Sequence, residues 1–299
     1  MSTPLLAMLP GNETFGAGIA GRLSADVAEL EVRSFPDEET YLRWQTSPKG
    51  RDVVLLCTLD RPDGKVLPLL FAAAAARDLG AASVGLVCPY LGYMRQDRRF
   101  RPGEAVTSAY FAAVVSAHCD WLVTVDPHLH RHGSLSNIYS APATVVQAAP
   151  LIAEWIARSI ERPVLIGPDE ESEQWVAAVA RRIDAPHTVL RKTRHSDRDV
   201  DVSVPDLERW HAHTPVLVDD IVSTGRTMIA TLHHLVENRT LPPTCIAVHG
   251  IFADTAYREL LDAGADRVVT CNTIPHDSNA IDVTGALADA IAERVSSRG

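Results

Sequence analysis

Residues 216–227 read Val-Leu-Val-Asp-Asp-Ile-Val-Ser-Thr-Gly-Arg-Thr, and this stretch indicates the kind of fold to expect. Its apolar start, Val216–Val218, predicts a strand that ends in two carboxylates, and residues 228–235 predict a helix. Between them lies a short loop of hydroxyl side chains around Gly225. A strand, a tight loop and a helix N-terminus form an anion site in α/β proteins, because backbone N–H groups converge there and the helix dipole favours negative charge.

The two carboxylates of this stretch, Asp219 and Asp220, need a different partner, because they would repel a phosphate group. Sugar hydroxyls are suitable partners, either directly or through Mg²⁺. The hydroxyl groups of Ser223, Thr224 and Thr227 add donors for the phosphate itself. The stretch therefore predicts a ligand that contains both a sugar and a phosphate.

Strand-like and helix-like runs alternate along the whole chain. The predicted strands are 53–59, 84–90, 121–126, 164–166, 187–191, 216–222, 245–251 and 267–271, and the predicted helices are 67–79, 108–116, 151–159, 172–182, 228–238 and 256–263. Such alternation indicates mainly parallel sheets flanked by helices, with ligands beyond the carboxyl ends of the strands. An Ala- and Pro-containing stretch near 141–150 favours a boundary between two domains, 1–145 and 146–299. The two halves have a similar order of strands and helices, which suggests a duplication, although the sequence shows no strong residue-level repeat.

The composition of the chain argues against two classes of protein, nucleic-acid-binding and membrane-spanning. The chain has 299 residues, 46% of them hydrophobic, and a formal net charge of −10. The acidic balance argues against a nucleic-acid surface, so an anionic substrate must be met by locally placed cations. The apolar runs are too short to span a bilayer and no signal pattern begins the chain, so we expect a cytoplasmic protein without a membrane partner. The five scattered cysteines are expected to be small buried thiols.

The stretch 219–227 resembles the phosphoribosyl-binding loop of type I phosphoribosyltransferases and ribose-phosphate pyrophosphokinases. This resemblance implies two type I phosphoribosyltransferase-like domains. It also implies a ribose-5-phosphate site made by Asp219, Asp220, Ser223, Thr224, Gly225, Arg226 and Thr227. The loop alone does not separate a transferase from a pyrophosphokinase, so that distinction depends on the rest of the chain.

Two segments of the first half resemble nucleotide-binding parts of ribose-phosphate pyrophosphokinases. Residues 33–43 resemble the adenine-binding loop, which implies that Phe35, Asp37 and Glu39 contact the base; an ordinary charged edge hairpin is the alternative. Glu38 stands where that family usually has glycine. Residues 89–99 resemble the segment whose Arg and Gln reach the nucleotide, which implies roles for Arg95, Gln96 and Asp97. The cationic stretch 99–108 that follows has the character of a lid, and a solvated basic helix face is its alternative.

The resemblance also implies metal and catalytic residues. His128, after the strand 121–126, and Asp169, in the acidic loop 167–172, are the implied Mg²⁺ ligands. Lys192 and Arg194, at the tip of 187–194, are the implied catalytic cations, with Thr193 where some relatives carry a second arginine. His130 and His132 have a spacing that also suits zinc, and their role stays open.

The six segments follow the family's order between residues 33 and 227 and imply a ribose-phosphate pyrophosphokinase. Such an enzyme transfers the pyrophosphoryl group of ATP to the 1-hydroxyl of ribose 5-phosphate, uses Mg²⁺ and forms a homo-oligomer. Three alternatives remain: a related enzyme with another ribose-phosphate acceptor, a type I phosphoribosyltransferase, and a regulatory paralogue without activity.

Overall fold

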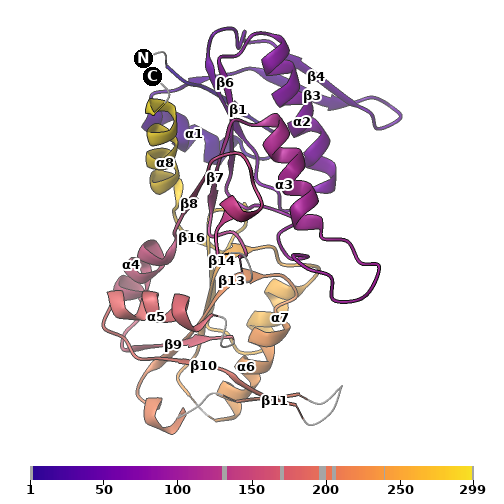
Figure 1. Cartoon of the computed structure of the whole chain (residues 1–299). Coiled ribbons are helices and arrows are strands. Elements are labelled where there is room, and N and C mark those ends of the chain that lie inside the picture. The colour runs from indigo at the N-terminus through magenta and orange to yellow at the C-terminus, as the bar shows by residue number, and fades with distance from the viewer. Residues whose placement is uncertain are drawn as a thin grey trace. The chain divides into compact units, whose positions relative to one another are not determined.

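The computed structural model describes residues 3–129, 133–168, 172–194, 200–203, 207–238 and 240–297, and the chain divides into two compact units. The first unit comprises Met1–Val146 and Thr284–Gly299, and the second comprises Gln147–Val283. Each unit contains a parallel sheet with helices on both faces, which confirms the predicted fold class (Figure 1).

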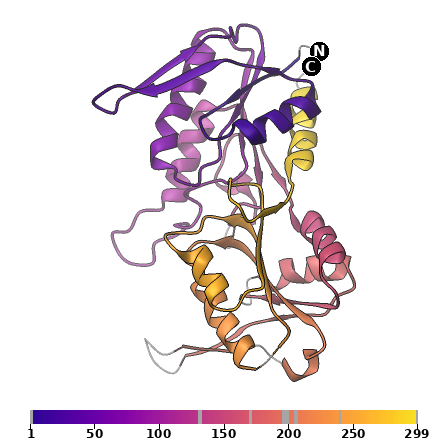
Figure 2. The same cartoon turned by 180° about the vertical axis from the view of Figure 1, so that it is seen from behind.

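The first unit is built on a six-stranded parallel sheet. In spatial order the strands are β2 (Asp26–Val27), β1 (Leu5–Met8), β5 (Asp52–Leu56), β6 (Ser83–Cys88), β7 (Trp121–Val125) and β8 (Ala143–Val146). Helices α1 (Glu13–Leu23) and α8 (Thr284–Ser296) cover one face, and α2 (Asp63–Asp78) and α3 (Thr107–His118) cover the other (Figures 1 and 2). Burial on both faces explains why the central strands are nearly continuous apolar runs.

The second unit repeats this architecture. Its parallel strands are, in spatial order, β10 (His187–Val189), β9 (Pro163–Gly167), β13 (Thr214–Val222), β14 (Thr244–Gly250), β15 (Arg267–Cys271) and β16 (Asn279–Ile281). Helices α4 (Ala149–Ser159) and α5 (Glu173–Arg182) cover one face, and α6 (Arg226–Glu237) and α7 (Ala256–Asp262) cover the other (Figure 1). Single 3₁₀ turns lie at Leu135–Asn137 in the first unit and Leu207–Trp210 in the second.

Each unit also carries an antiparallel hairpin between its second and third sheet strands along the chain. The first unit has β3 (Leu30–Ser34) and β4 (Thr40–Trp44), and the second has β11 (Arg191–Arg194) and β12 (Val200–Ser203). The prediction of one strand at 187–191 is therefore wrong. β10 ends at Val189, and β11 begins at Arg191 and pairs with β12 in the hairpin. Leu190, between the two strands, donates its N–H to the Gly167 carbonyl at the end of β9.

The duplication extends to matching positions in the two units. Met8 pairs with Leu56 in the first sheet as Ile166 pairs with Leu217 in the second, and a glycine lies eight positions after each of these third-strand residues, at Gly64 and Gly225. Left-handed backbones lie at the C-cap of α1, Ser24 (φ 49°), and at the second residue after α5, Asp184 (φ 51°). The structure thus reveals positional equivalences that the divergent side chains hide.

The C-terminal helix α8 differs from the expected domain division. The predicted second domain, 146–299, included it, whereas α8 packs on α1, β7 and β8 of the first unit. Its Leu287 and Ile291 are fully buried there, and the Arg294 side chain donates to the Thr144 hydroxyl at 2.7 Å. A pattern read along the chain does not reveal this return to the first unit, because it depends on contacts distant in sequence.

All five cysteines are free and buried, as predicted. Burial raises the pKa of Cys57, Cys119 and Cys245 to about 12, so these thiols stay protonated at neutral pH. Among the described residues, none of the helices combines the length and the apolar character needed to cross a bilayer.

Candidate functional site

The loop that follows β13 forms a shallow cavity at the carboxyl edge of the second sheet. The strand ends at Val222, Gly225 adopts a left-handed backbone (φ 66°), and α6 begins at Arg226. The cavity has a volume of about 170 Å³ and is lined by Asp219, Ile221, Val222, Ser223, Thr224, Gly225, Arg226, Thr227 and Met228. Six of the seven residues predicted for ribose 5-phosphate, all except Asp220, therefore line one cavity at a helix N-terminus.

The two carboxylates lie within β13 rather than after it. Asp219 pairs with Ala247 and Ile221 with His249 in the neighbouring strand, so the ladder continues past both carboxylates. Because successive residues of a strand face opposite sides, Asp219 and Asp220 point to different faces. Asp219 faces the cavity, and its carboxylate accepts the Asp220 N–H at 2.9 Å.

Two other parts of the predicted site belong to the same unit. The end of β9 pairs with β13, and Ile166 lies opposite Leu217. β11 starts one residue after Leu190, whose N–H bonds to Gly167 at the end of β9, so β11 begins beside that strand end. The backbone pairing of β11 with β12 puts Lys192 opposite Val202 and Arg194 opposite Val200. The predicted metal ligand Asp169 lies outside the described residues.

The predicted base-contacting residues lie at the tip of the β3–β4 hairpin. The Phe35 N–H donates to the Glu39 carbonyl at 2.8 Å, and the Glu38 N–H donates to the Phe35 carbonyl at 2.9 Å. Phe35 is 42% exposed, and Asp37 and Glu39 are also exposed. The Arg33 guanidinium lies 3.9 Å from the centre of the Tyr41 ring, on which Phe35 packs edge-on. The tip is thus an exposed aromatic platform with charged neighbours.

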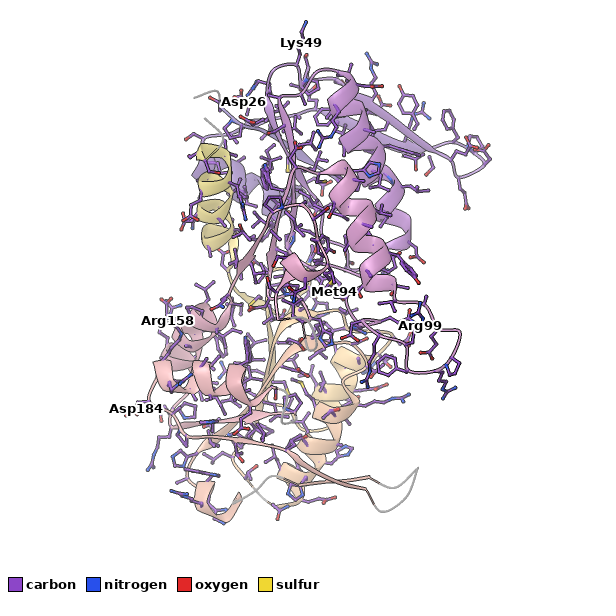
Figure 3. All side chains as sticks on the ribbon, viewed as in Figure 1. Asp26, Lys49, Met94, Arg99, Arg158 and Asp184 are labelled. Carbon is purple, nitrogen blue, oxygen red and sulfur yellow. The ribbon has the colours of Figure 1, made fainter. Side chains whose placement is uncertain are left out.

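Residues 89–106 form the connection between β6 and α3. Arg95 is exposed, Gln96 is half-buried and Asp97 is buried, so these three predicted residues do not share one environment. Glu104 closes the following turn, because its carboxylate accepts the N–H groups of Phe100 and Arg101 at 2.7 and 3.0 Å. Arg99 lies on this exposed loop, whereas Met94 is buried before it (Figure 3).

The hairpin tip and this loop are separate within the first unit. In both views the tip projects beside one end of the α2–α3 layer, and the loop projects at the other (Figures 1 and 2). Within the first unit, the hairpin tip and the projecting part of this loop therefore do not lie side by side. The sequence pattern gives residue types but not this separation.

The first unit also carries the other predicted metal ligand. His128 follows β7 after a tight turn at Asp126 (φ 27°) and is half-buried. His130 and His132, whose spacing also suited zinc, lie outside the described residues. Within the described part of the chain, three or more His, Cys, Asp or Glu side chains do not gather into a metal cage.

A turn at residues 251–253, of which only Ile251 falls in the predicted strand 245–251, contacts the phosphate loop directly. Its N–H groups donate to the carbonyl oxygens of Val222 and Ser223 at 2.9–3.1 Å. The only available sequence signal was Gly250, a glycine at the end of an apolar run.

Comparison with known proteins agrees with this architecture. A model of the N-terminal domain of ribose phosphate pyrophosphokinase matches residues 5–118, and a phosphoribosyl transferase domain model matches residues 134–286. A ribose-phosphate pyrophosphokinase of Methanothermobacter thermautotrophicus is 32% identical over 94% of this chain and 98% of its own length. One of Methanopyrus kandleri is 32% identical over 92% and 94%.

A solved structure shows the same fold over the full chain. The crystal structure of phosphoribosylpyrophosphate synthetase from Mycobacterium smegmatis aligns over 100% of both chains with a TM-score of 0.88, at 23% sequence identity. Together with the two matched domains and the relatives above, this shows that the chain belongs to the ribose-phosphate pyrophosphokinase family.

Proposed function

We propose that this enzyme transfers the pyrophosphoryl group of ATP to the 1-hydroxyl of ribose 5-phosphate, giving phosphoribosyl pyrophosphate and AMP. The observation that carries the proposal is the cavity at 219–228. There a carboxylate, three hydroxyl side chains and a helix N-terminus surround one space. That set suits a ligand with sugar hydroxyls at one end and a phosphate at the other.

In this reaction the 1-hydroxyl attacks the β-phosphorus and AMP leaves on the opposite side, so catalysis consists mainly of positioning and charge stabilisation. Asp219 and Asp220 bind ribose hydroxyls, and residues 223–227 bind the 5-phosphate. Lys192 and Arg194, on β11, stabilise the negative charge on the transferring group. The position of β11 beside the end of β9, the strand next to β13, supports this role.

The nucleotide is bound by Phe35, Asp37 and Glu39 of the hairpin tip and by Arg95, Gln96 and Asp97. Stacking of adenine on the exposed Phe35 ring and bonds from its amino group to the carboxylates suit the chemistry of the tip. His128 and Asp169 would hold Mg²⁺, which would supply positive charge to neutralise the phosphate groups. The enzyme is a homo-oligomer of the cytoplasm, and sedimentation and cell fractionation test these two statements.

Two other reactions are distinguished by their products. A type I phosphoribosyltransferase would form a nucleotide from phosphoribosyl pyrophosphate and a free base, and an enzyme with another acceptor would leave ribose 5-phosphate unused. We expect AMP and phosphoribosyl pyrophosphate in equal amounts, and only with protein, ATP, ribose 5-phosphate and a divalent cation together. Formation of ADP in place of AMP would exclude pyrophosphoryl transfer. A protein that binds both substrates without turnover would favour a regulatory paralogue.

A further inference from the structure

The turn at Ile251–Ala253 determines how the loop after β13 presents its N–H groups. The Val222 carbonyl accepts the N–H groups of Ile251 and Phe252, at 2.9 and 3.1 Å. The Ser223 carbonyl accepts the Ala253 N–H at 3.0 Å. Two consecutive carbonyl groups of the loop therefore point towards this turn.

A trans peptide bond directs its C=O and the next N–H to opposite sides. The N–H groups of Ser223 and Thr224 consequently point away from the 251–253 turn. The cavity lies on that side, because its lining includes residues 221–228 but none of residues 251–253. The turn thus aims two backbone donors at the space proposed for the 5-phosphate.

The turn that makes these bonds is strained. Phe252 has a left-handed backbone (φ 45°), and so does Asp254 (φ 52°). Phenylalanine rarely adopts this conformation, because its Cβ approaches the following carbonyl oxygen. A conformation of this kind persists when its surroundings impose it.

An aromatic cluster supplies those surroundings. Phe252 is 8% exposed, and its ring centre lies 4.6 Å from that of His276 and 5.3 Å from that of Tyr257. The Tyr257 and His276 rings are 4.7 Å apart, and His276 is held in turn by Ser278 through its Nδ1 at 2.9 Å. The absence of a side chain at Gly250 makes room for the ring, because a Cβ there would lie 2.5 Å from the Phe252 ring.

We infer that Phe252, Tyr257 and His276 form a positioning cluster for the sugar-phosphate site: by holding the strained 251–253 turn, they orient the Ser223 and Thr224 N–H groups towards the 5-phosphate. Phe252 contacts the loop through its backbone N–H, and all three residues lie outside the cavity lining. The inference rests on the function proposed above. None of these three residues was predicted from the sequence to take part in binding or catalysis.

Direct titration of ribose 5-phosphate, without ATP, tests the cluster separately from turnover. Tyr257→Ala and Gly250→Ala should each weaken ribose 5-phosphate binding by about 10-fold or more, since bonds to a charged phosphate lose their alignment. The KM for ATP should change less than about 3-fold. Tyr257→Phe keeps the ring and should restore binding to near the wild-type value.

A matched control separates positioning from general loss of packing. Leu235 is fully buried in α6 of the same unit, and Leu235→Ala should lower the unfolding midpoint without weakening ribose 5-phosphate binding. Equal weakening in Leu235→Ala and Tyr257→Ala, or unchanged binding in both Tyr257→Ala and Gly250→Ala, would overturn the inference. A wild type that binds ribose 5-phosphate but makes no AMP would overturn the proposed function alone.

Discussion

At the scale of single residues, Asp219 and Asp220 are adjacent in sequence but face opposite sides of β13. Asp219 lines the cavity, so Asp219→Ala should raise the KM for ribose 5-phosphate far more than the KM for ATP. Loss of hydrogen bonds between a carboxylate and sugar hydroxyls costs on the order of 1–3 kcal/mol. Steady-state kinetics with each substrate varied in turn measures this.

Asp220→Ala is the companion measurement at this pair. Asp220 does not line the cavity, but it is proposed to bind ribose hydroxyls as well, so the same selective rise is expected. Equal damage to both substrates in either variant would indicate a folding defect rather than a ribose contact.

Lys192 is the residue whose loss should act on the chemical step. A cation beside the transferring group stabilises charge that develops in the transition state, so Lys192→Ala should mainly lower kcat. We expect a loss of about 10²–10⁴-fold, with binding of ATP and ribose 5-phosphate within a few-fold of wild type. Titration of each substrate together with kcat measurement checks the split.

The double variant tests whether Lys192 and Arg194 serve the same charge. Both lie on β11, two residues apart, and therefore on one face of the strand. Adding Arg194→Ala should cost less than the sum of the two single losses. Turnover at the wild-type rate in Lys192→Ala would remove its catalytic role.

At the scale of elements, the β3–β4 hairpin shows how a departure from the family pattern affects the backbone. Glu38, where the family usually has glycine, has φ 70° at the end of a three-residue hairpin loop. That position favours glycine, so Glu38→Gly should stabilise the protein by about 1 kcal/mol through relief of left-handed strain. Chemical denaturation measures the gain. Glu38→Ala keeps the strain, and an equal gain there would contradict this explanation.

Long apolar strands and several of their flanking helices were predictable, whereas short strands and the helices α1 and α8 were not. The strand 267–271 was predicted with its observed bounds, because it is an apolar run with turn residues at both ends. β1 and β16 have four and three residues and carry too little pattern to be recognised. They are stabilised by pairing with β5 and β15, which the local sequence does not encode.

At the scale of the whole molecule, the duplicated architecture places a second loop at the position of the sugar-phosphate loop. Lys65 lies in the first turn of α2, the helix after β5, and Arg226 is the first residue of α6, the helix after β13. In the first unit, however, Lys65 forms an ion pair with Asp60 and donates to the Thr58 carbonyl at 3.0 Å. Pro62, at the start of this helix, has no N–H to donate. The first unit's loop is therefore unsuited to phosphate.

This contrast gives a matched pair of variants. Arg226→Met should weaken ribose 5-phosphate binding by roughly 3–30-fold, since it removes a cation beside the proposed phosphate position. Lys65→Met should leave that binding unchanged, because its charge is already paired within the first unit. Isothermal titration compares the two, and a similar loss in both would contradict the assignment of the sugar phosphate to the second unit.

The residue types of the site were predictable from sequence, but their arrangement was not. The stretch 216–227 indicated the loop, and six of its seven predicted residues line the cavity. The Ile251–Ala253 turn was missed because backbone hydrogen bonds to a distant loop leave no side-chain signature. The packing of α8 on the first unit was also missed, because it depends on contacts with β7 and β8, which are far away in the chain.

The central claim is that the β- and γ-phosphoryl groups of ATP move together to ribose 5-phosphate. Incubation with ATP labelled at the β-phosphorus, ribose 5-phosphate and Mg²⁺, followed by separation of the products, tests it most directly. We expect the label in phosphoribosyl pyrophosphate and none in the AMP formed beside it. Label recovered in ADP would show ordinary γ-phosphoryl transfer and would contradict the account.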